Sequence, residues 1–309
     1  MHLDVSQPDL SSYRKGNTGI DYVHRFESGR PGPHVLVNAL THGNEICGMV
    51  AVKHLLDSEV RPAIGTLTLS FANVEAYNAF DPARPYDNRQ LVHNLNRIWT
   101  PEILDGQENS PEICRARELR PALDAADHLL DIHSTRADVA PFWVYPPFAR
   151  NTELASAIQR VPLHLEMSPA LSPAGATGLT QYGHYGNSFT RNTGVVIECG
   201  QHFKPESSRL ATEVVKDYLA YFGLITTPRD EIEPHAPPRR FELLTVCMVR
   251  TTEFSFVRPL TGFEVFSRGE LIATDGDDEI RSPCDHCTIF MPTQEAIVGR
   301  EAVYLTRPL

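Results

Sequence analysis

The chain has 309 residues, of which 41% are apolar and 22% are charged, and its formal net charge is -11 at pH 7. This composition is typical of a folded protein with a sizeable core and excludes a mainly disordered chain. The acidic balance, with no local stripe of Lys and Arg to offset it, argues against nucleic acid as a partner.

The N-terminal residues predict neither export nor membrane insertion. The segment MHLDVSQPDLSSYRKG (1–16) has no basic region followed by an apolar one, and no apolar window in the chain approaches about 18 residues. We therefore expect a cytoplasmic protein without a membrane partner. The scattered cysteines predict reduced thiols rather than a disulfide framework: Cys47, Cys114, Cys199, Cys247, Cys284 and Cys287.

Short apolar runs alternate with longer amphipathic stretches through residues 1–226, which predicts an α/β fold. The expected strands are 34–40, 66–73, 128–132 and 194–200, and the expected helices are 45–60, 113–123, 151–160 and 207–224. We therefore predict a mostly parallel or mixed sheet with helices on both faces. The long, weakly periodic segment 71–111 interrupts this pattern, and long irregular segments of compact domains are usually functional.

The character of the sequence changes near residue 226. Residues 227–240 contain four prolines and no apolar periodicity, which is typical of a linker. Residues 241–309 are short β-rich runs separated by Gly, Asp and Pro turns. We therefore predict a catalytic domain at 1–226, a Pro-rich linker at 227–240 and a small all-β domain at 241–309.

Several chemically capable side chains lie at the ends of the predicted strands or of the irregular segment. In an open α/β sheet, ligands bind beyond the carboxyl ends of the strands. The candidates at such positions are His42, Glu45, His133, Glu198, Asn96 and Arg97.

Two imidazoles and one carboxylate are the ligand set of a catalytic zinc ion. His42 and Glu45 are three residues apart in a loop that Gly43 allows to be tight, and His133 would add a ligand from a distant strand. Glu198 is a candidate base, because a carboxylate in the apolar run VVIEC is unfavourable without a task or a partner. Zinc there would acidify water and polarise a carbonyl group.

Each of these features also has a plainer explanation. A single His-x-x-Glu pattern arises often by chance, and Glu198 can instead form a structural pair with an arginine such as Arg191. Arg89 and Arg97 can be solvated surface charges. Cys284 and Cys287 form one CxxC, which offers thiolates to a second zinc, although burial in the β domain is the better interpretation.

Four motifs, in this order and at these separations, carry a resemblance to a known family. They are THGNE (41–45), LNR (95–97) with Asn96 seven residues after Arg89, DIHST (131–135) and GVVIECG (194–200). The chain resembles the succinylglutamate desuccinylase/aspartoacylase family of zinc hydrolases, which is related to the zinc carboxypeptidases. The tail segments GELIATDGD (269–277) and IFMPTQEAIVGREAVYL (289–305) are similar to that family's closing β domain.

The resemblance implies a metal site and a base. His42, Glu45 and His133 would hold one zinc ion per chain, and Glu198 would be the general base. Asp131, two residues before His133 and so on the same side of a strand, would support that histidine, or would have no role.

The resemblance also implies two contacts to the substrate. Arg89 would stabilise the oxyanion of the tetrahedral intermediate. Asn96 and Arg97 would hold a substrate carboxylate or the acyl group, because a guanidinium matches a carboxylate with two parallel hydrogen bonds.

The sequence departs from the family where specificity is set. The arginine that aspartoacylase-like members carry ten residues before the catalytic glutamate is replaced by Ser188, and Arg191 lies nearby but out of register. We therefore predict a zinc-dependent deacylase or amidohydrolase that cleaves a small anionic N-acyl amino acid, with the acyl group undefined. The alternatives are a zinc carboxypeptidase acting on peptides or peptidoglycan fragments, and a binding protein without activity. The sequence allows a homo-oligomer but does not predict one.

Overall fold

The computed structural model describes residues 7–172, 176–226 and 237–309. Its main sheet has eleven strands in the order β1-β3-β2-β4-β7-β5-β6-β8-β14-β13-β10 among these residues. The strands are β1 (Val23–Glu27), β2 (His34–Ala39), β3 (Thr66–Phe71), β4 (His128–Thr135), β5 (Phe142–Tyr145), β6 (Leu163–Glu166), β7 (Thr193–Gln201), β8 (Arg239–Met248), β10 (Val265–Phe266), β13 (Cys287–Phe290) and β14 (Glu301–Pro308). The predicted α/β architecture is confirmed.

The centre of the sheet is parallel and buried on both sides. β2 runs parallel to β3 and β4, and β4 runs parallel to β7, whereas β1 and β5 pair antiparallel with β3 and β7. Successive side chains of a strand point to opposite faces. In β2, Val35 and Val37 join the core on one face and Leu36 joins the core on the other, so both faces of the strand are buried.

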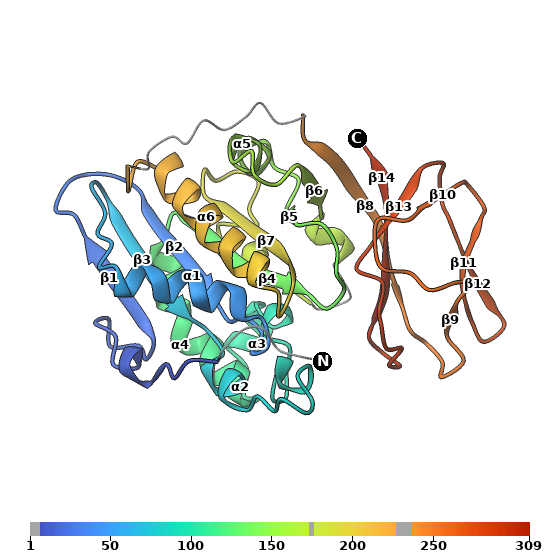
Figure 1. The fold of residues 1–309 in the computed structure, drawn as a ribbon, viewed down its shortest axis with the longest axis horizontal. Coiled ribbons are helices and arrows are strands. Elements are labelled where there is room, and N and C mark those ends of the chain that lie inside the picture. Colours follow the sequence, from blue (N-terminus) through green and yellow to red (C-terminus); the bar gives the residue numbers. More distant parts are fainter. Residues whose placement is uncertain (1–6, 173–175, 227–236) are drawn as a thin grey trace.

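Helices cover both faces of the parallel part. The helices are α1 (Ile46–Asp57), α2 (Val74–Asn78), α3 (Pro101–Leu104), α4 (Pro111–Ala125), α5 (Ala149–Ala157) and α6 (Pro205–Tyr221). Figure 1 shows α1 and α6 side by side in front of the sheet and α4 behind it. No helix of the described residues is both long enough and apolar enough to cross a membrane.

The C-terminal strands extend the main sheet rather than starting a separate one. β8 pairs in parallel with β6, and β14, β13 and β10 follow it antiparallel. A second sheet contains β9 (Ser255–Phe256), β11 (Leu271–Asp275) and β12 (Asp278–Arg281). Residues 227–236 of the predicted linker lie outside the described residues, and β8 begins at Arg239, within the predicted linker. The division into two domains stays a prediction.

The differences between predicted and observed elements are informative. Each predicted strand and helix of residues 34–224 has a counterpart, but β4 runs on to Thr135, so His133 lies inside the strand rather than at its end. The sequence did not reveal the short strands β1, β5 and β6. Segment 71–111 contains α2, α3 and two 3-10 turns, η2 (Asp87–Arg89) and η3 (Leu95–Arg97).

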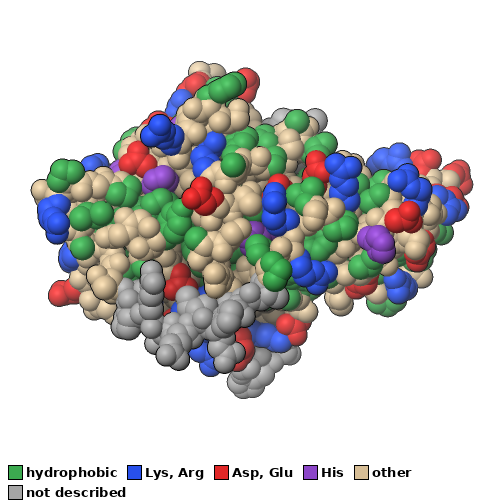
Figure 2. Space-filling model, turned by 90° about the horizontal axis from the view of Figure 1, so that it is seen from above, with side chains coloured by type: hydrophobic (Ala, Val, Ile, Leu, Met, Phe, Trp, Pro, Cys, Tyr) green, Lys and Arg blue, Asp and Glu red, His purple; other side chains and the backbone are tan. Residues whose placement is uncertain are grey.

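Figure 2 shows side chains of both charges interspersed over one face of the molecule.

Candidate metal centre and substrate pocket

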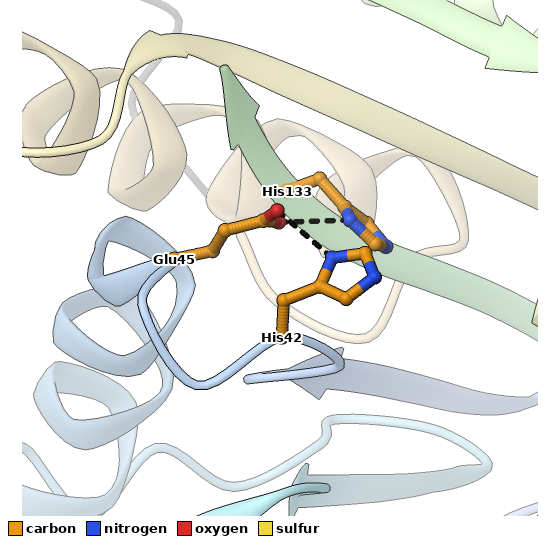
Figure 3. A group of neighbouring side chains, drawn as sticks. All are labelled: His42, Glu45 and His133. Carbon is orange, nitrogen blue, oxygen red and sulfur yellow. Dashed lines mark hydrogen bonds and ion pairs between the residues drawn. The ribbon is translucent and has the colours of Figure 1, made fainter. Parts of the chain in front are cut away.

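Three of the predicted residues meet beyond the carboxyl ends of β2 and β4. His42 and Glu45 lie in the turn between β2 and α1, and His133 lies near the end of β4. Donor atoms of the three side chains all lie within 4.8 Å of one another, and the three residues are buried. In Figure 3 both imidazoles point toward the Glu45 carboxylate. The structure thus brings the predicted ligands together, and their binding of a metal stays a prediction.

The tight turn that carries His42 and Glu45 depends on Gly43. A Cβ atom at this position would lie 2.4 Å from the carbonyl oxygen of Asn88 and 2.5 Å from the backbone of Ala76. The Gly43 N–H also donates to the carbonyl oxygen of Arg89 at 3.0 Å. The missing side chain therefore lets the segment that carries Arg89 pack directly against the turn.

Both ring nitrogens of each imidazole have a partner, and the partner of Nε2 orients the ring. Nδ1 of His42 and Nδ1 of His133 each lie 2.8 Å from an oxygen of Glu45. Nε2 of His42 lies 2.9 Å from Oδ1 of Asn94, and Nε2 of His133 lies 2.7 Å from Oδ2 of Asp131. Metal-binding histidines almost always use their second ring nitrogen in this way.

Asp131 is itself held by two further donors. Its Oδ1 accepts hydrogen bonds from Asn38 Nδ2 at 2.8 Å and from Thr41 Oγ1 at 2.7 Å. Asn38 and Asp131 are cross-strand partners in the β2–β4 register, so the sheet fixes both side chains. The position of Asp131 thus agrees with its predicted role in supporting His133.

The charges around the three residues suit a divalent cation. Burial, together with Arg89, lowers the pKa of His42 to about 4, so this imidazole is neutral at pH 7. Burial opposes ionisation of Glu45, yet His42 and His133 hold its pKa well below the usual value. His133 is also buried, yet Asp131 and Glu45 raise its pKa well above the usual value. Two imidazoles and one carboxylate in a buried site fit zinc.

Glu198 lies beside the three residues, on β7. It is the register partner of His133 and lines the same pocket. Its Oε2 atom is buried and has no hydrogen-bond partner among the described residues. Burial raises the pKa of Glu198 to about 8, against the opposing effect of His133. Within the described chain no ion pair joins Glu198 to Arg191, so the structural pairing considered from the sequence is not observed.

Arg89 ends η2 and reaches the carboxylate of Glu45. Its Nη1 donates to Oε1 of Glu45 at 2.6 Å, and the side chain is 38% exposed at the pocket surface. Arg89 is therefore not a solvated surface charge. Its guanidinium is positioned next to the carboxylate that the two histidines share.

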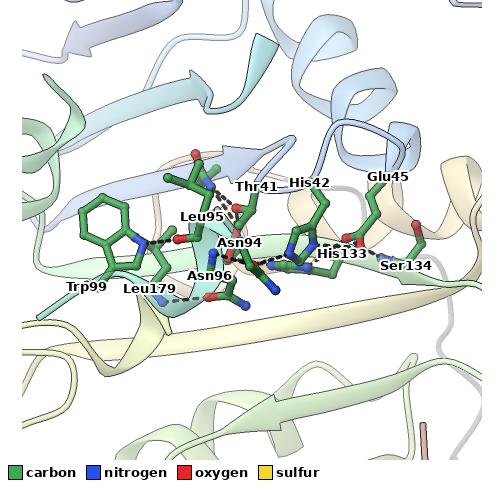
Figure 4. Close-up of polar contacts among 12 residues, drawn as sticks. Thr41, His42, Glu45, Asn94, Leu95, Asn96, Trp99, His133, Ser134 and Leu179 are labelled. Atoms are coloured by element: carbon green, nitrogen blue, oxygen red, sulfur yellow. Dashed lines mark hydrogen bonds and ion pairs between the residues drawn. The ribbon is translucent and has the colours of Figure 1, made fainter. Parts of the chain in front are cut away.

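Asn96 and Arg97 follow on the other side of His42. Figure 4 shows Asn94 between His42 and Asn96, and Oδ1 of Asn96 accepts from the Leu179 N–H at 2.8 Å. Nε and Nη2 of Arg97 donate to the two carboxylate oxygens of Glu301 at 2.9 Å and 3.0 Å. The guanidinium that the resemblance assigns to the substrate thus already holds a carboxylate of the chain.

These side chains open into a pocket of about 720 Å³. His42, Glu45, His133 and Glu198 form what we call the strand-end wall. The opposite side, the C-terminal wall, is formed by residues 261–263 and 291–295 and by Ile297, Arg300, Glu301 and Tyr304. The pocket therefore lies between the parallel sheet and the C-terminal strands.

Several residues in or beside the pocket were not found from the sequence. Asn94 and Ser134 are neighbours of the motifs, and their position beside LNR and DIHST was an available signal. Glu301 and Tyr304 lie in the tail motif but contact Arg97 across more than 200 positions of the chain, so local patterns gave no sign of the contact. His202 lies four residues after Glu198 and lines the pocket, because a bulge turns the end of β7.

The two cysteines of the tail CxxC pack against an apolar core. Cys287 is buried and Cys284 partly buried against the core of the C-terminal strands. Among the described residues, His42, Glu45 and His133 are the group of His, Cys, Asp or Glu side chains with metal-binding spacing. Burial, the preferred interpretation from the sequence, is what the structure shows.

The fold and the residues at its strand ends define a class. An open α/β sheet with this arrangement is of the zinc carboxypeptidase-like type. Residues 31–220 match the succinylglutamate desuccinylase/aspartoacylase catalytic domain. The chain therefore belongs to the succinylglutamate desuccinylase/aspartoacylase family, as the motifs predicted.

Individual relatives agree with this assignment. The chain is 31% identical over 120 residues to human N-acyl-aromatic-L-amino acid amidohydrolase (carboxylate-forming), and the match spans 35% of each protein, about a third of the length of that relative. Succinylglutamate desuccinylase from Vibrio parahaemolyticus superposes with a TM-score of 0.69 at 15% identity, over 94% of this chain and 86% of that one. Murine aminoacylase 3 gives 0.66 at 22% identity, over 91% and 96%. At these identities the two structures establish a shared fold.

Proposed function

We propose that the chain is a zinc-dependent amidohydrolase that removes the acyl group from a small N-acyl amino acid. The observation that carries the proposal is that His42, Glu45 and His133 meet Glu198 in one pocket, where the buried Oε2 of Glu198 has no partner among the described residues. Membership of the family and the names of its relatives support the reaction class.

The ligand atoms would be Nδ1 of both histidines and the Glu45 carboxylate. Zinc supplies a Lewis acid that acidifies water and polarises an amide carbonyl. Asp131 and Asn94 keep Nδ1 of each imidazole directed inward by binding Nε2. Because an adjacent cation favours ionised carboxylates, Glu45 is kept as an anion in the loaded site.

Glu198 would move the proton. Its carboxylate accepts a proton from water and then donates it to the leaving amine, and a pKa near neutrality serves both steps. Burial has already raised the pKa of Glu198 to about 8 in the site without a cation, and a neighbouring cation would lower it toward the working range.

Arg89 would stabilise negative charge on the former carbonyl oxygen. Its guanidinium is fixed by Glu45 at one end and exposed to the pocket at the other. A donor that is oriented before the reaction stabilises developing charge more effectively than a mobile one. The pocket, closed on one side by the C-terminal wall, favours a small substrate over an extended peptide.

The metal content of the purified protein tests the site. We expect about one zinc per chain in the wild type, loss of it in His42→Ala, and no change in His54→Ala, an exposed histidine of α1 that serves as control. Elemental analysis on folded protein, checked by circular dichroism, gives the answer. Zinc retained by His42→Ala would contradict the ligand assignment.

Released amine then tests the reaction. The panel is N-acetyl-L-phenylalanine, N-acetyl-L-aspartate, N-succinyl-L-glutamate and a tripeptide. We expect turnover of at least one N-acyl amino acid, and Glu198→Gln should keep zinc while losing about 10²- to 10⁴-fold in kcat. Cleavage of the tripeptide alone would favour the carboxypeptidase alternative.

A further inference from the structure

We infer that the pocket binds an uncharged, apolar group of the substrate in a corner beside Glu198, so that N-acyl amino acids with an apolar chain or ring are turned over best. The residues that line this apolar corner are Val139, Phe142, Phe263, Met291 and Pro292. The inference rests on the proposed amidohydrolase function, and it names the substrate class of that same pocket together with residues that select it.

The apolar corner begins next to the proposed reacting groups. Phe142 of β5 is the register partner of Glu198 on β7, and Glu198 is the register partner of His133 on β4. Register partners on neighbouring strands lie on the same face of a sheet, and the strands are about 4.8 Å apart. One row across the sheet therefore leads from a histidine of the metal centre to the proposed base and then to an aromatic ring. A substituent a few bonds from the reacting amide would reach Phe142.

The C-terminal wall continues the apolar surface that Phe142 begins. The ring centres of Phe142 and Phe263 lie 5.7 Å apart in an edge-to-face arrangement. A Cβ atom at Gly262 would lie 3.2 Å from the Val139 side chain and 3.7 Å from Pro292, so these two residues pack around the loop that carries Phe263. The apolar corner is thus one continuous surface, built from the β4–β5 connection on one side and from the C-terminal wall on the other.

The side chains of the apolar corner offer no charge and no hydrogen-bond donor. Val139, Phe263 and Met291 are only partly buried against the core beneath them, so part of their apolar surface faces the pocket. A carboxylate among them would lose its hydration without gaining a donor, whereas an apolar group would be removed from water. The pocket volume of about 720 Å³ is in the range that holds drug-sized ligands, so a chain or ring fits beside the amide.

Two residues of the apolar corner have a strained backbone. Phe263 and Met291 have φ of 69° and 47°, and they are two of the six non-glycine residues with positive φ in the described chain. Bulky residues rarely adopt this conformation, and where the surroundings hold them in it the strain often marks a ligand site. Here the Phe263 N–H donates to the Ile289 carbonyl oxygen at 2.7 Å, and Gln294 Nε2 donates to that of Pro292 at 3.2 Å. The C-terminal wall therefore keeps large apolar side chains where Gly or Asn would be less strained.

Two substrate series test the inference and show which part of the substrate occupies the apolar corner. The first varies the amino acid in N-acetyl-L-alanine, N-acetyl-L-leucine and N-acetyl-L-phenylalanine, and the second varies the acyl group in N-acetyl-, N-butanoyl- and N-hexanoyl-L-alanine. For the zinc-loaded wild type, kcat/KM should rise about fourfold for each added CH₂ in at least one series. A carboxylate at the end of the varied group, as in N-acetyl-L-aspartate or N-succinyl-L-alanine, should abolish the gain. A rise in neither series would overturn the inference.

Met291→Asn connects the preference to the apolar corner. Asn tolerates the left-handed conformation better than Met does, so the variant relieves strain while it makes the wall polar. The measured quantity is kcat/KM for the largest member of each series divided by that for N-acetyl-L-alanine, which both series share. This ratio should fall about tenfold in one series, and that series identifies the group that the corner binds. Met291→Leu keeps an apolar side chain and should keep the wild-type ratio.

The matched control is His286→Asn. His286 also has a left-handed backbone, with φ of 56°, but it is exposed and lies outside the pocket, just before β13. The control should keep both wild-type ratios. Unchanged ratios in Met291→Asn would overturn the inference, as would an equal loss in His286→Asn, because the effect would then come from the C-terminal strands as a whole. The wild-type series alone decides the matter if Met291→Asn does not fold.

A binding measurement separates this inference from the proposed function. Calorimetry on the purified protein supplied with zinc compares the two sets of products: L-alanine, L-leucine and L-phenylalanine, and acetate, butanoate and hexanoate. In at least one set the affinity should rise with each added carbon, and Met291→Asn should reduce this rise. That result without turnover of any N-acyl amino acid would reject the proposed reaction but keep the apolar corner as a binding site. Turnover that does not depend on apolar size in either series would reject the apolar corner alone.

Discussion

The two walls of the pocket are built in different ways. The strand-end wall is carried by three adjacent parallel strands, and its histidines and Glu45 are at most 2% exposed. The C-terminal wall contains a loop, residues 294–300, whose side chains are exposed. This difference indicates that the sheet fixes the groups that would perform the reaction, whereas the exposed loop determines which substrates fit the pocket.

The contacts within each wall explain this difference. Asp131 joins His133, Thr41 and Asn38 in one buried network, so no member moves without leaving a partner unpaired. The C-terminal loop is anchored mainly at its ends, by hydrogen bonds from Thr293 to Ala302 at 2.7 Å and from Gly299 to Val249 at 2.8 Å. Substitutions in the strand-end wall should therefore abolish activity, whereas substitutions in the C-terminal wall should change kcat/KM by smaller factors.

The largest effect is expected from Gly43→Ala. The added methyl group meets the backbone of Asn88 and Ala76, which cannot move aside as a side chain can. We expect loss of zinc and activity, and destabilisation by about 3 kcal/mol in urea unfolding. Gly19→Ala is the control: a Cβ there meets nothing within 4 Å, and only its φ of 82° is unfavourable. It should lose about 1 kcal/mol and keep its zinc.

The second-largest effect is expected from Asp131→Asn. It is compared with the same change at Asp275, a buried aspartate of the C-terminal strands. Asp131→Asn should lower zinc affinity about 10- to 100-fold, because Nε2 of His133 loses its anionic partner. Asp275 is also buried and accepts from the N–H groups of Arg250 and Thr251 at 2.7 Å and 2.8 Å. Asp275→Asn should reduce stability by about 1–3 kcal/mol without changing zinc affinity. Competition with a chelator measures the zinc affinity of the two variants, and urea unfolding measures their stability. Equal losses of zinc affinity would show that the metal site depends on the C-terminal strands as much as on Asp131.

The sequence predicted the strand-end wall because its residues obey local rules. His42 and Glu45 follow an apolar strand at once, and Glu198 stands out as a charge in an apolar run. Parallel strands place such ends at one edge of a sheet, so the grouping follows from topology. β4 runs three residues beyond its predicted end. His133 nevertheless lies at the same edge of the sheet, because the strand still ends there.

The C-terminal wall and the pairing of Arg97 were beyond sequence reasoning for a physical reason. Glu301 meets Arg97 only because β14 lies beside β8 and β8 beside β6, and strand order in a sheet is not encoded in any single strand. His202 was missed because the bulge at Gly200 changes which way the next residues face. Both depend on tertiary structure rather than on periodicity.

Glu301→Gln should give a moderate effect that is confined to the substrate. The variant keeps the shape of Glu301 but weakens its two hydrogen bonds to Arg97, so we expect kcat/KM to fall about tenfold with zinc unchanged. Glu242→Gln is the control, because Glu242 pairs with Arg307 at 2.7 Å on the exposed side of the same sheet. Such exposed pairs contribute about 0–1 kcal/mol, so its kinetics should be unchanged. Loss of zinc in Glu301→Gln would contradict the separation of the walls.

The smallest effect at neutral pH concerns the junction of the two regions. His164 is buried on β6, opposite Arg240 of β8, and burial lowers its pKa to about 4. Its Nδ1 contacts the Tyr145 hydroxyl at 2.9 Å. Because the unfolded chain binds a proton near the ordinary histidine pKa of about 6.5, the stability from neutral His164 is complete above that pH and is lost as pH falls toward 4.

His164→Gln removes this titration. Urea midpoints between pH 7.5 and pH 4.5 should fall less steeply in the variant than in the wild type, with the two curves parallel above pH 6.5. The relative gain in the variant should be on the order of 2 kcal/mol at the acid end. His54→Gln should follow the wild-type slope. Identical slopes for His164→Gln and wild type would show that the seam between β6 and β8 opens before His164 is protonated, so that the two regions unfold separately in acid.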